Sequence, residues 1–150
     1  MWKSEFIIHA TMPLSPTYTK IIAIPQSAID ENGHLNNVTY VQWMQDIAVE
    51  HYSSIGGVEA QGPNATWVVR EHKIEYLLPA FANEEIEIRT WVENIRRVRS
   101  LRKYEFIRKS DGKVLVRGET YWVFVDVKTG SPRAVPEEVT KVFVSIQREV

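Results

Sequence analysis

Residues 36–57 read NNVTYVQWMQDIAVEHYSSIGG and carry the longest helical pattern in the chain. Asn36 or Asn37 can cap the start of this helix, because an asparagine oxygen accepts hydrogen bonds from the free N–H groups of the first turn. Large apolar residues then recur at helical spacing: Tyr40, Met44, Ile47, Ala48 and Ile55. Gly56 and Gly57 end the pattern. So many large apolar residues indicate a helix that is wrapped by other elements.

Strand patterns lie on both sides of this helix in the sequence. One covers residues 18–24, and four follow the helix at residues 66–78, 84–93, 100–107 and 114–127. They alternate apolar and polar residues, as strands with one buried face do. In the first of the four, the alternation places on a common face Val68, Ile74, Tyr76 and Leu78. The dipeptide Asp111-Gly112 predicts a hairpin between the last two strands, and Pro136 can open a short final helix.

This order of elements predicts the fold class. Long antiparallel strands around a single buried helix make an α+β domain, in which a curved sheet wraps around one central helix. The chain has 150 residues, enough for one core, and it contains no internal repeat. We therefore expect residues 1–150 to form a single domain. Residues 1–17 contain Pro13 and Pro16 and are expected to form an N-terminal arm or an edge strand.

Composition excludes several classes of protein. With 44% apolar and 25% charged residues, the chain is an ordinary globular domain and not a disordered one. Its net charge of −1 does not favour nucleic acid or a membrane surface as a partner. The absence of cysteine excludes disulfides and thiolate catalysis, and the four histidines lack the spacing of a metal site. No signal peptide or spanning segment is recognisable, so we expect a cytoplasmic protein.

The most polar segment, DENGHLNNVTY at residues 30–40, lies directly before and within the helix start. Free N–H groups at a helix N-terminus stabilise developing negative charge, and a nearby carboxylate can act as a general base or a nucleophile. Gly33 lets the backbone approach a ligand closely. These features suit hydrolysis of an activated acyl group by Asp30. The alternative is equally open at this point: Asp30 and Asn32 form only a polar turn, and Asn37 only caps the helix.

The same segment resembles a known motif. The pattern D-x-N-x-H-x-N-N-x-x-Y is filled by Asp30, Asn32, His34, Asn36, Asn37 and Tyr40. It is similar to the motif of hot-dog-fold acyl-ACP thioesterases, where ACP is acyl carrier protein. The broader pattern D-x-x-G-x-[VL]-x-x-x-x-Y resembles the 4-hydroxybenzoyl-CoA thioesterase group of the same fold. Residues 121–125, 128–130 and 134–139 resemble the last strand and tail of acyl-ACP thioesterase domains, so that the likeness covers residues 18–142.

The resemblance implies a hot-dog fold that cleaves a thioester to a free acid and a thiol without a metal or redox cofactor. It places Asp30 at the catalytic carboxylate, with His34 and Asn37 beside the thioester. It further implies that Asn32, Gly33 and Tyr40 contact the substrate. Hot-dog sites generally lie between subunits, so the resemblance implies a homodimer or homotetramer. The plant enzymes have Gln where Gly33 stands, whereas the CoA-dependent group has Gly, so the carrier stays open between CoA and ACP.

A cluster of basic residues could contact that carrier. Ten of the 18 lysines and arginines lie between residues 89 and 117. Because the guanidinium fork suits phosphate, we expect Arg97 and Arg99 to bind the phosphates of CoA or an acidic carrier protein. The alternative is a set of solvated strand ends.

Two further hypotheses concern the activity itself. One is a non-catalytic acyl-binding hot-dog module, and the other is a dehydratase that uses His34 with Asp46. Glu50, on the polar face of the helix, is expected to be solvated.

Overall fold

The computed structural model describes residues 12–148, so most of the expected N-terminal arm lies outside the described residues. The strands are β1 (Tyr18–Ala23), β2 (Ala65–Tyr76), β3 (Glu85–Arg96), β4 (Arg99–Arg108) and β5 (Val114–Asp126). The helices are η1 (Gln26–Ala28), α2 (Asn37–Ser54), α3 (Gly57–Gln61) and α4 (Glu137–Arg148). The predicted strands, long helix and final helix are therefore present, whereas α3 was not predicted.

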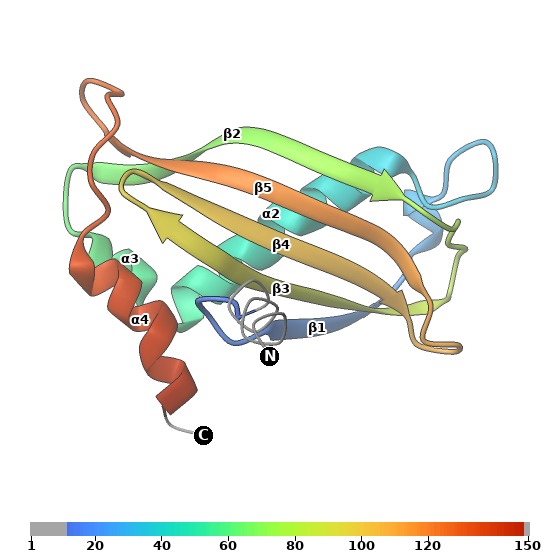
Figure 1. Cartoon of the computed structure of the whole chain (residues 1–150). Helices are drawn as coiled ribbons and strands as arrows, with labels where there is room; N and C mark the ends of the chain where they lie inside the picture. Colours follow the sequence, from blue (N-terminus) through green and yellow to red (C-terminus); the bar gives the residue numbers. More distant parts are fainter. Residues whose placement is uncertain (1–11, 149–150) are drawn as a thin grey trace, which may run out of the picture.

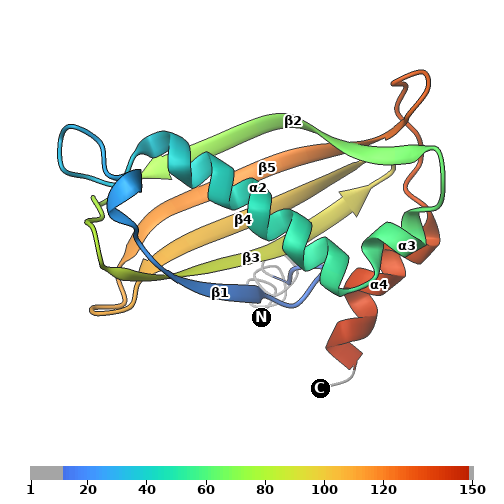
Figure 2. The same ribbon diagram turned by 180° about the vertical axis from the view of Figure 1, so that it is seen from behind.

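The five strands form one antiparallel sheet in the order β1-β3-β4-β5-β2. Helix α2 crosses one face of this sheet, and α3 and α4 lie near the end of the sheet where α2 finishes (Figures 1 and 2). Irregularities in the pairing of β2, β3 and β4 bend the strands, as β-bulges do. The predicted architecture, a curved antiparallel sheet around one long helix, is confirmed.

Helix α2 begins as the sequence predicts. The Asn36 side chain accepts a hydrogen bond from the Val38 N–H at 2.9 Å, so Asn36 is the N-cap. Tyr40, Met44, Ile47 and Ala48 are buried against the sheet. Val38 and Val49 remain 72% and 54% exposed. The described residues thus cover one face of the helix. We expected other elements to wrap the helix, and this is true of that face only.

Gly118 explains how closely the helix approaches the sheet. A Cβ atom at this position on β5 would lie 2.9 Å from Met44 Cε and 3.0 Å from Met44 Sδ. Met44 is fully buried at the middle of α2. The missing side chain at Gly118 therefore provides the space that Met44 fills.

One predicted strand face is wrong. A bulge between Val69 and Glu71 shifts the pairing of β2 with β5. As a result Trp67 packs in the core before the bulge and Ile74 packs in the core after it, whereas Val68 is 40% exposed. Val68 and Ile74 therefore lie on opposite faces, because the extra residue reverses the alternation. Leu78 lies beyond the end of β2.

Candidate functional site

The loop that precedes α2 is closed by its own backbone. An isolated β-bridge joins Ile29 to Leu35, and the Asp30 N–H donates to the His34 carbonyl oxygen at 2.8 Å. The Gly33 N–H donates to the Asp30 carbonyl oxygen at 3.0 Å. Gly33 has a φ of +80°, a conformation that L side chains rarely adopt. Leu35 is buried and anchors the loop to the core.

The Asp30 carboxylate holds this loop in shape. Its Oδ1 atom accepts hydrogen bonds from the backbone N–H groups of Asn32 at 2.9 Å and His34 at 3.2 Å. Among the described residues, no donor contacts the other oxygen, Oδ2. The predicted polar turn is thus present, and it uses only one of the two carboxylate oxygens. The second oxygen is available for a substrate or a water molecule.

Two adjacent asparagines have different positions at the start of α2. Asn36 caps the helix, whereas Asn37 is the first helical residue and has an exposed side chain. The Tyr76 hydroxyl donates to the Asn37 carbonyl oxygen at 3.2 Å, and this contact ties β2 to the helix start. The alternative in which Asn37 only caps the helix is therefore wrong.

A half-open groove of about 270 Å³ lies between the start of α2 and the end of β2. It is lined by His34, Asn37, Tyr40 and Tyr76, and by the apolar residues that follow β2. The Tyr40 hydroxyl is buried and has no hydrogen-bond partner among residues 12–148. Burial, reinforced by the nearby Tyr76, raises the pKa of Tyr40 to about 12, so the phenol keeps its proton at neutral pH. The groove is therefore lined by an imidazole and an amide, next to a neutral phenol whose hydroxyl is buried.

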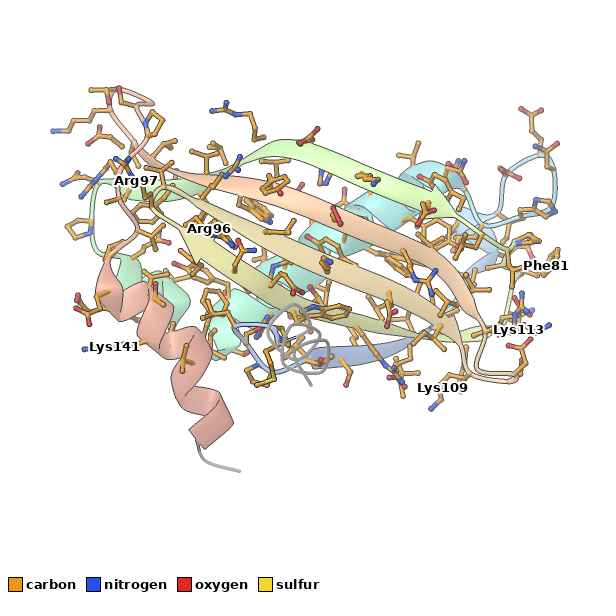
Figure 3. The ribbon with its side chains drawn as sticks, in the orientation of Figure 1. Phe81, Arg96, Arg97, Lys109, Lys113 and Lys141 are labelled. Carbon is orange, nitrogen blue, oxygen red and sulfur yellow. The ribbon has the colours of Figure 1, made fainter. Side chains whose placement is uncertain are left out.

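The predicted residues fall into three groups. His34, Asn37 and Tyr40 line the groove, whereas Asp30, Asn32 and Gly33 belong to the adjoining loop without lining the groove. Arg97 lies at the β3–β4 turn, at the opposite end of the sheet from Phe81 (Figure 3). Phe81 marks the loop end of the molecule, because its ring lies 5.4 Å from that of His34.

The two arginines of the third group lie far from the loop. Arg99, two residues after Arg97, is the first residue of β4. Its Cζ atom lies 4.8 Å from the centre of the Tyr121 ring. One chain therefore does not bring Arg97 and Arg99 to the Asp30 loop.

Other basic residues lie at the loop end instead. Lys109 and Lys113 flank the β4–β5 hairpin, at the same end of the sheet as Phe81 (Figure 3). Lys109 lies 3.8 Å from a Glu87 oxygen, and Lys113 forms no ion pair within the described part of the chain. The sequence placed both lysines in the basic cluster, but the prediction singled out the arginines.

The helix residues considered for other roles do not join this site. Asp46 is exposed on α2 and accepts from the Gln42 side chain at 2.8 Å, about two and a half turns from the helix start. It therefore gives no support to a His34–Asp46 pair. Glu50 forms an ion pair with Lys20 at 2.8 Å, and both side chains are over 40% exposed, in agreement with its predicted solvated position.

A buried polar pair was missed by sequence reasoning. His51 and Arg102 are 3% and 4% exposed, and an Arg102 Nη1 N–H donates to His51 Nδ1 at 2.9 Å. Burial, with a smaller effect of the Arg102 charge, lowers the pKa of His51 to about 3. His51 follows Ile47 by four residues and Ala48 by three, so the helical pattern already places it on the buried face.

Within residues 12–148 the side chains form no group of three or more histidine and carboxylate ligands that could hold a metal ion. No described helix is long and apolar enough for a membrane span.

Comparisons with known proteins place this geometry in context. The model of the family described as the thioesterase-like superfamily matches residues 24–143. No curated protein sequence matches the chain. Among solved structures, a 1,4-dihydroxy-2-naphthoyl-CoA thioesterase from Synechocystis has a TM-score of 0.77 at 13% identity, covering 88% of this chain and 98% of its own. A Staphylococcus aureus protein solved in complex with CoA has a TM-score of 0.79 at 16% identity, covering 92% and 87%.

An acyl-ACP thioesterase from Bacteroides thetaiotaomicron has a TM-score of 0.77 at 25% identity. The match covers 85% of this chain but only 53% of that protein, so this chain spans about half its length.

Proposed function

The chain belongs to the thioesterase-like superfamily and has the hot-dog fold, and on this premise we propose that it hydrolyses an acyl-CoA or acyl-ACP thioester to a free acid and a thiol. One observation carries the proposal: the loop before α2 holds a carboxylate with one free oxygen, and His34 of the same loop lines a groove at the helix start. This arrangement supplies a base or nucleophile and a place for the acyl carbonyl.

The reaction follows from these groups. With Asp30 as general base, Oδ2 takes a proton from water as the water oxygen attacks the thioester carbon. The carbonyl oxygen becomes negative, and the Asn37 N–H at the helix start, which donates to no acceptor within residues 12–148, can stabilise it. The carbon–sulfur bond then breaks, and the thiolate leaves and takes up a proton. With Asp30 as nucleophile, Oδ2 attacks the carbon itself, and the thiolate leaves and takes up a proton. Water then attacks the Asp30 carbon of the resulting anhydride, which releases the free acid and restores the carboxylate. Hydrolysis in ¹⁸O water distinguishes the two routes, because a single turnover labels Asp30 only in the second.

The names of similar proteins support both carriers. The Synechocystis protein is named for a CoA thioester and the Staphylococcus aureus protein was solved with CoA, whereas the Bacteroides protein is named for ACP. Lys109 and Lys113 lie at the loop end of the molecule and could contact the carrier phosphates (Figure 3). Arg97 and Arg99 could do so only in a site that a second copy completes.

Truncated thioesters separate these two assignments. We expect Lys109→Ser with Lys113→Ser to raise KM several-fold for an acyl-CoA and to leave KM for the matching N-acetylcysteamine thioester unchanged, because the latter carries no phosphate. If instead Arg97→Ser with Arg99→Ser raises KM for the acyl-CoA alone, the carrier phosphates bind at the β3–β4 turn of a neighbouring chain.

Exposed apolar side chains around the groove support an oligomer. Val38 on α2 and Leu77, Leu78 and Phe81 after β2 are between 39% and 72% exposed. A second copy that covers them would also close the half-open groove, which supports a homodimer at least. Light scattering after size exclusion measures the mass directly. A single 17.4 kDa species at micromolar concentration would contradict this assembly.

A non-catalytic acyl-binding module is the second candidate, and one observation favours it. Asp30 Oδ1 accepts two backbone N–H groups, so the carboxylate already has a structural role. Such a module binds an acyl group without needing an ionised Asp30.

Release of free thiol tests the proposed activity. We expect the full-length protein to release thiol from at least one member of a panel of short-chain, long-chain and aromatic acyl-CoAs and acyl-ACPs. Glu31→Gln, which removes an exposed neighbouring carboxylate, is the matched control and should keep this activity, whereas Asp30→Asn should lose it. Binding of the acyl thioesters without any turnover would favour the binding module. Equal turnover in wild type and Asp30→Asn would refute the assignment of Asp30.

A further inference from the structure

A second cavity lies far from the Asp30 loop. It has a volume of about 200 Å³, is half open, and is lined by the C-terminal half of α2 together with α3, α4, β2, β4 and β5. Its nearest residues on α2, Ala48 to Tyr52, follow Asn37 by 11 to 15 positions. At 1.5 Å per residue this places them about 16 to 22 Å along the helix from the groove. Within one chain the cavity is therefore separate from the groove at the helix start.

The walls of this cavity are mainly apolar and aromatic. Tyr52, Trp67, Trp122 and Phe143 contribute rings, and Ala48 and Val49 contribute aliphatic surface. Among the described residues, none that lines the cavity is acidic. Such walls suit an apolar ligand of limited size. An apolar cavity of about 150 Å³ in another protein holds benzene, so about 200 Å³ accommodates a ring with one small substituent.

One charged group faces this apolar space. Arg102 lines the cavity and is only 4% exposed. Its Nη1 atom donates to His51 Nδ1 at 2.9 Å and to Thr90 Oγ1 at 3.0 Å. The N–H groups on Nη2 and Nε donate to no atom of the described residues, and no carboxylate of residues 12–148 lies within ion-pair distance. Arg102 is thus a buried cation that lines an apolar cavity and has donors without a partner in residues 12–148.

The chemistry of Arg102 selects a carboxylate. A buried charge without a counter-ion is unfavourable, and a planar guanidinium matches a carboxylate through two parallel hydrogen bonds. Burial lowers the pKa of Arg102 to about 10, which still leaves the guanidinium charged at neutral pH. His51 is neutral there, because burial and the Arg102 charge hold its pKa near 3, so it adds no second positive charge. The Ser100 hydroxyl also borders the cavity and can donate to the same anion.

We propose that this cavity binds a small carboxylic acid with an apolar body, its carboxylate held by Arg102 and its body packed among Tyr52, Trp67, Trp122 and Phe143. This site does not depend on thioester hydrolysis, because its residues and those of the Asp30 loop do not overlap.

Benzoate is the probe, and benzamide, which has the same shape without the charge, is the control ligand. We expect benzoate to bind the full-length protein with a dissociation constant of roughly 0.1 to 1 mM, a range suited to so small a ligand. In an NMR titration the indole N–H signals of Trp67 and Trp122 should shift, whereas that of Trp91 on the outer face of β3 should not. Benzamide should bind at least tenfold more weakly.

Two kinds of variant locate the anion. Arg102→Met should weaken benzoate binding at least tenfold and leave benzamide binding unchanged. Because a change at a buried residue can disturb the fold, Val49→Trp at the exposed edge of the cavity is the second variant, and it should block benzoate without touching Arg102. Val38→Trp, at the exposed start of the same helix, is its control and should bind benzoate normally.

Equal binding of benzoate and benzamide, or benzoate binding that survives both cavity variants, would overturn the proposal. So would shifts confined to signals outside the cavity. None of these results depends on whether Asp30 hydrolyses a thioester, which thiol release measures independently.

Discussion

Replacement of His51 by Asn should change how the stability of the protein depends on pH. In the folded protein His51 is 3% exposed and accepts a hydrogen bond from Arg102. Asparagine places an amide oxygen close to the position of Nδ1, so Arg102 keeps an acceptor, but asparagine cannot take up a proton. The change also removes the ring contacts of His51 with Tyr18 and Phe143, which lowers stability equally at every pH.

The size of the effect follows from the two pKa values of His51. Burial first, and the Arg102 charge second, lower the pKa from 6.5 to about 3. The unfolded chain therefore binds a proton as pH falls below 6.5, whereas the folded chain does not until about pH 3. The stability contributed by neutral His51 is present above pH 6.5 and is lost as pH falls toward 3. Linkage at about 1.4 kcal/mol per pH unit gives a loss of about 2 kcal/mol between pH 7.5 and pH 5.

Urea unfolding of both proteins at pH 7.5, 6.5, 5.5 and 5.0 measures this loss. Other groups titrate in both proteins, including His72, whose pKa is also lowered by burial, so the difference between the two curves isolates His51. We expect the wild-type free energy of unfolding to fall by about 2 kcal/mol more than that of His51→Asn over this range. Parallel curves for the two proteins would show that His51 is not held neutral by burial, and the reasoning would fail.

Three further substitutions test the fold by urea unfolding. Asn36→Ala removes the 2.9 Å capping hydrogen bond of α2 and should lower the free energy of unfolding by about 1 kcal/mol. Asn32→Ala in the exposed loop should lower it by less. Equal losses in the two variants would contradict the assignment of Asn36 as the cap. Met44→Ala empties the space beside Gly118 and should cost about 2 to 5 kcal/mol, and a loss below about 1 kcal/mol would mean that the helix does not pack as described. Gly57→Ala should lower the free energy of unfolding, because the new Cβ would overlap the Tyr52 ring, and an unchanged free energy of unfolding would contradict that contact.

The sequence predicted the elements of the fold because each long pattern is locally determined. Alternation over Ile86, Ile88 and Val92 and helical spacing over Tyr40, Met44 and Ile47 both correspond to buried faces. The bulge at Val69 and Glu71 was not predictable, because it depends on how β2 pairs with β5. That single extra residue reversed the assigned face of Val68.

The candidate site was predicted only where it is local in sequence. His34, Asn37 and Tyr40 line one groove, since all three belong to the loop and first turn of the helix. Arg97 and Arg99 were joined to that site by residue type alone. In a meander, successive turns lie at opposite ends of the sheet, so the β3–β4 turn of Arg97 is remote from the β4–β5 hairpin of Lys113 (Figure 3).

The buried pair was missed for another physical reason. Charged and titratable residues are usually exposed, and reading them as solvated is correct for Glu50 but wrong for Arg102. The strand alternation that buries Tyr104 and Phe106 also points Arg102 inward, which was the available signal.

The rate of thiol release by Asp30→Asn, measured together with its stability, tests the central claim most directly. Asparagine keeps an oxygen that can accept from the N–H groups of Asn32 and His34, so the free energy of unfolding should change by less than about 1 kcal/mol. Loss of the ionised oxygen should lower kcat for the best acyl thioester by roughly 10²- to 10⁴-fold. A variant that folds normally and keeps the wild-type kcat would contradict the assignment of thioester hydrolysis to Asp30.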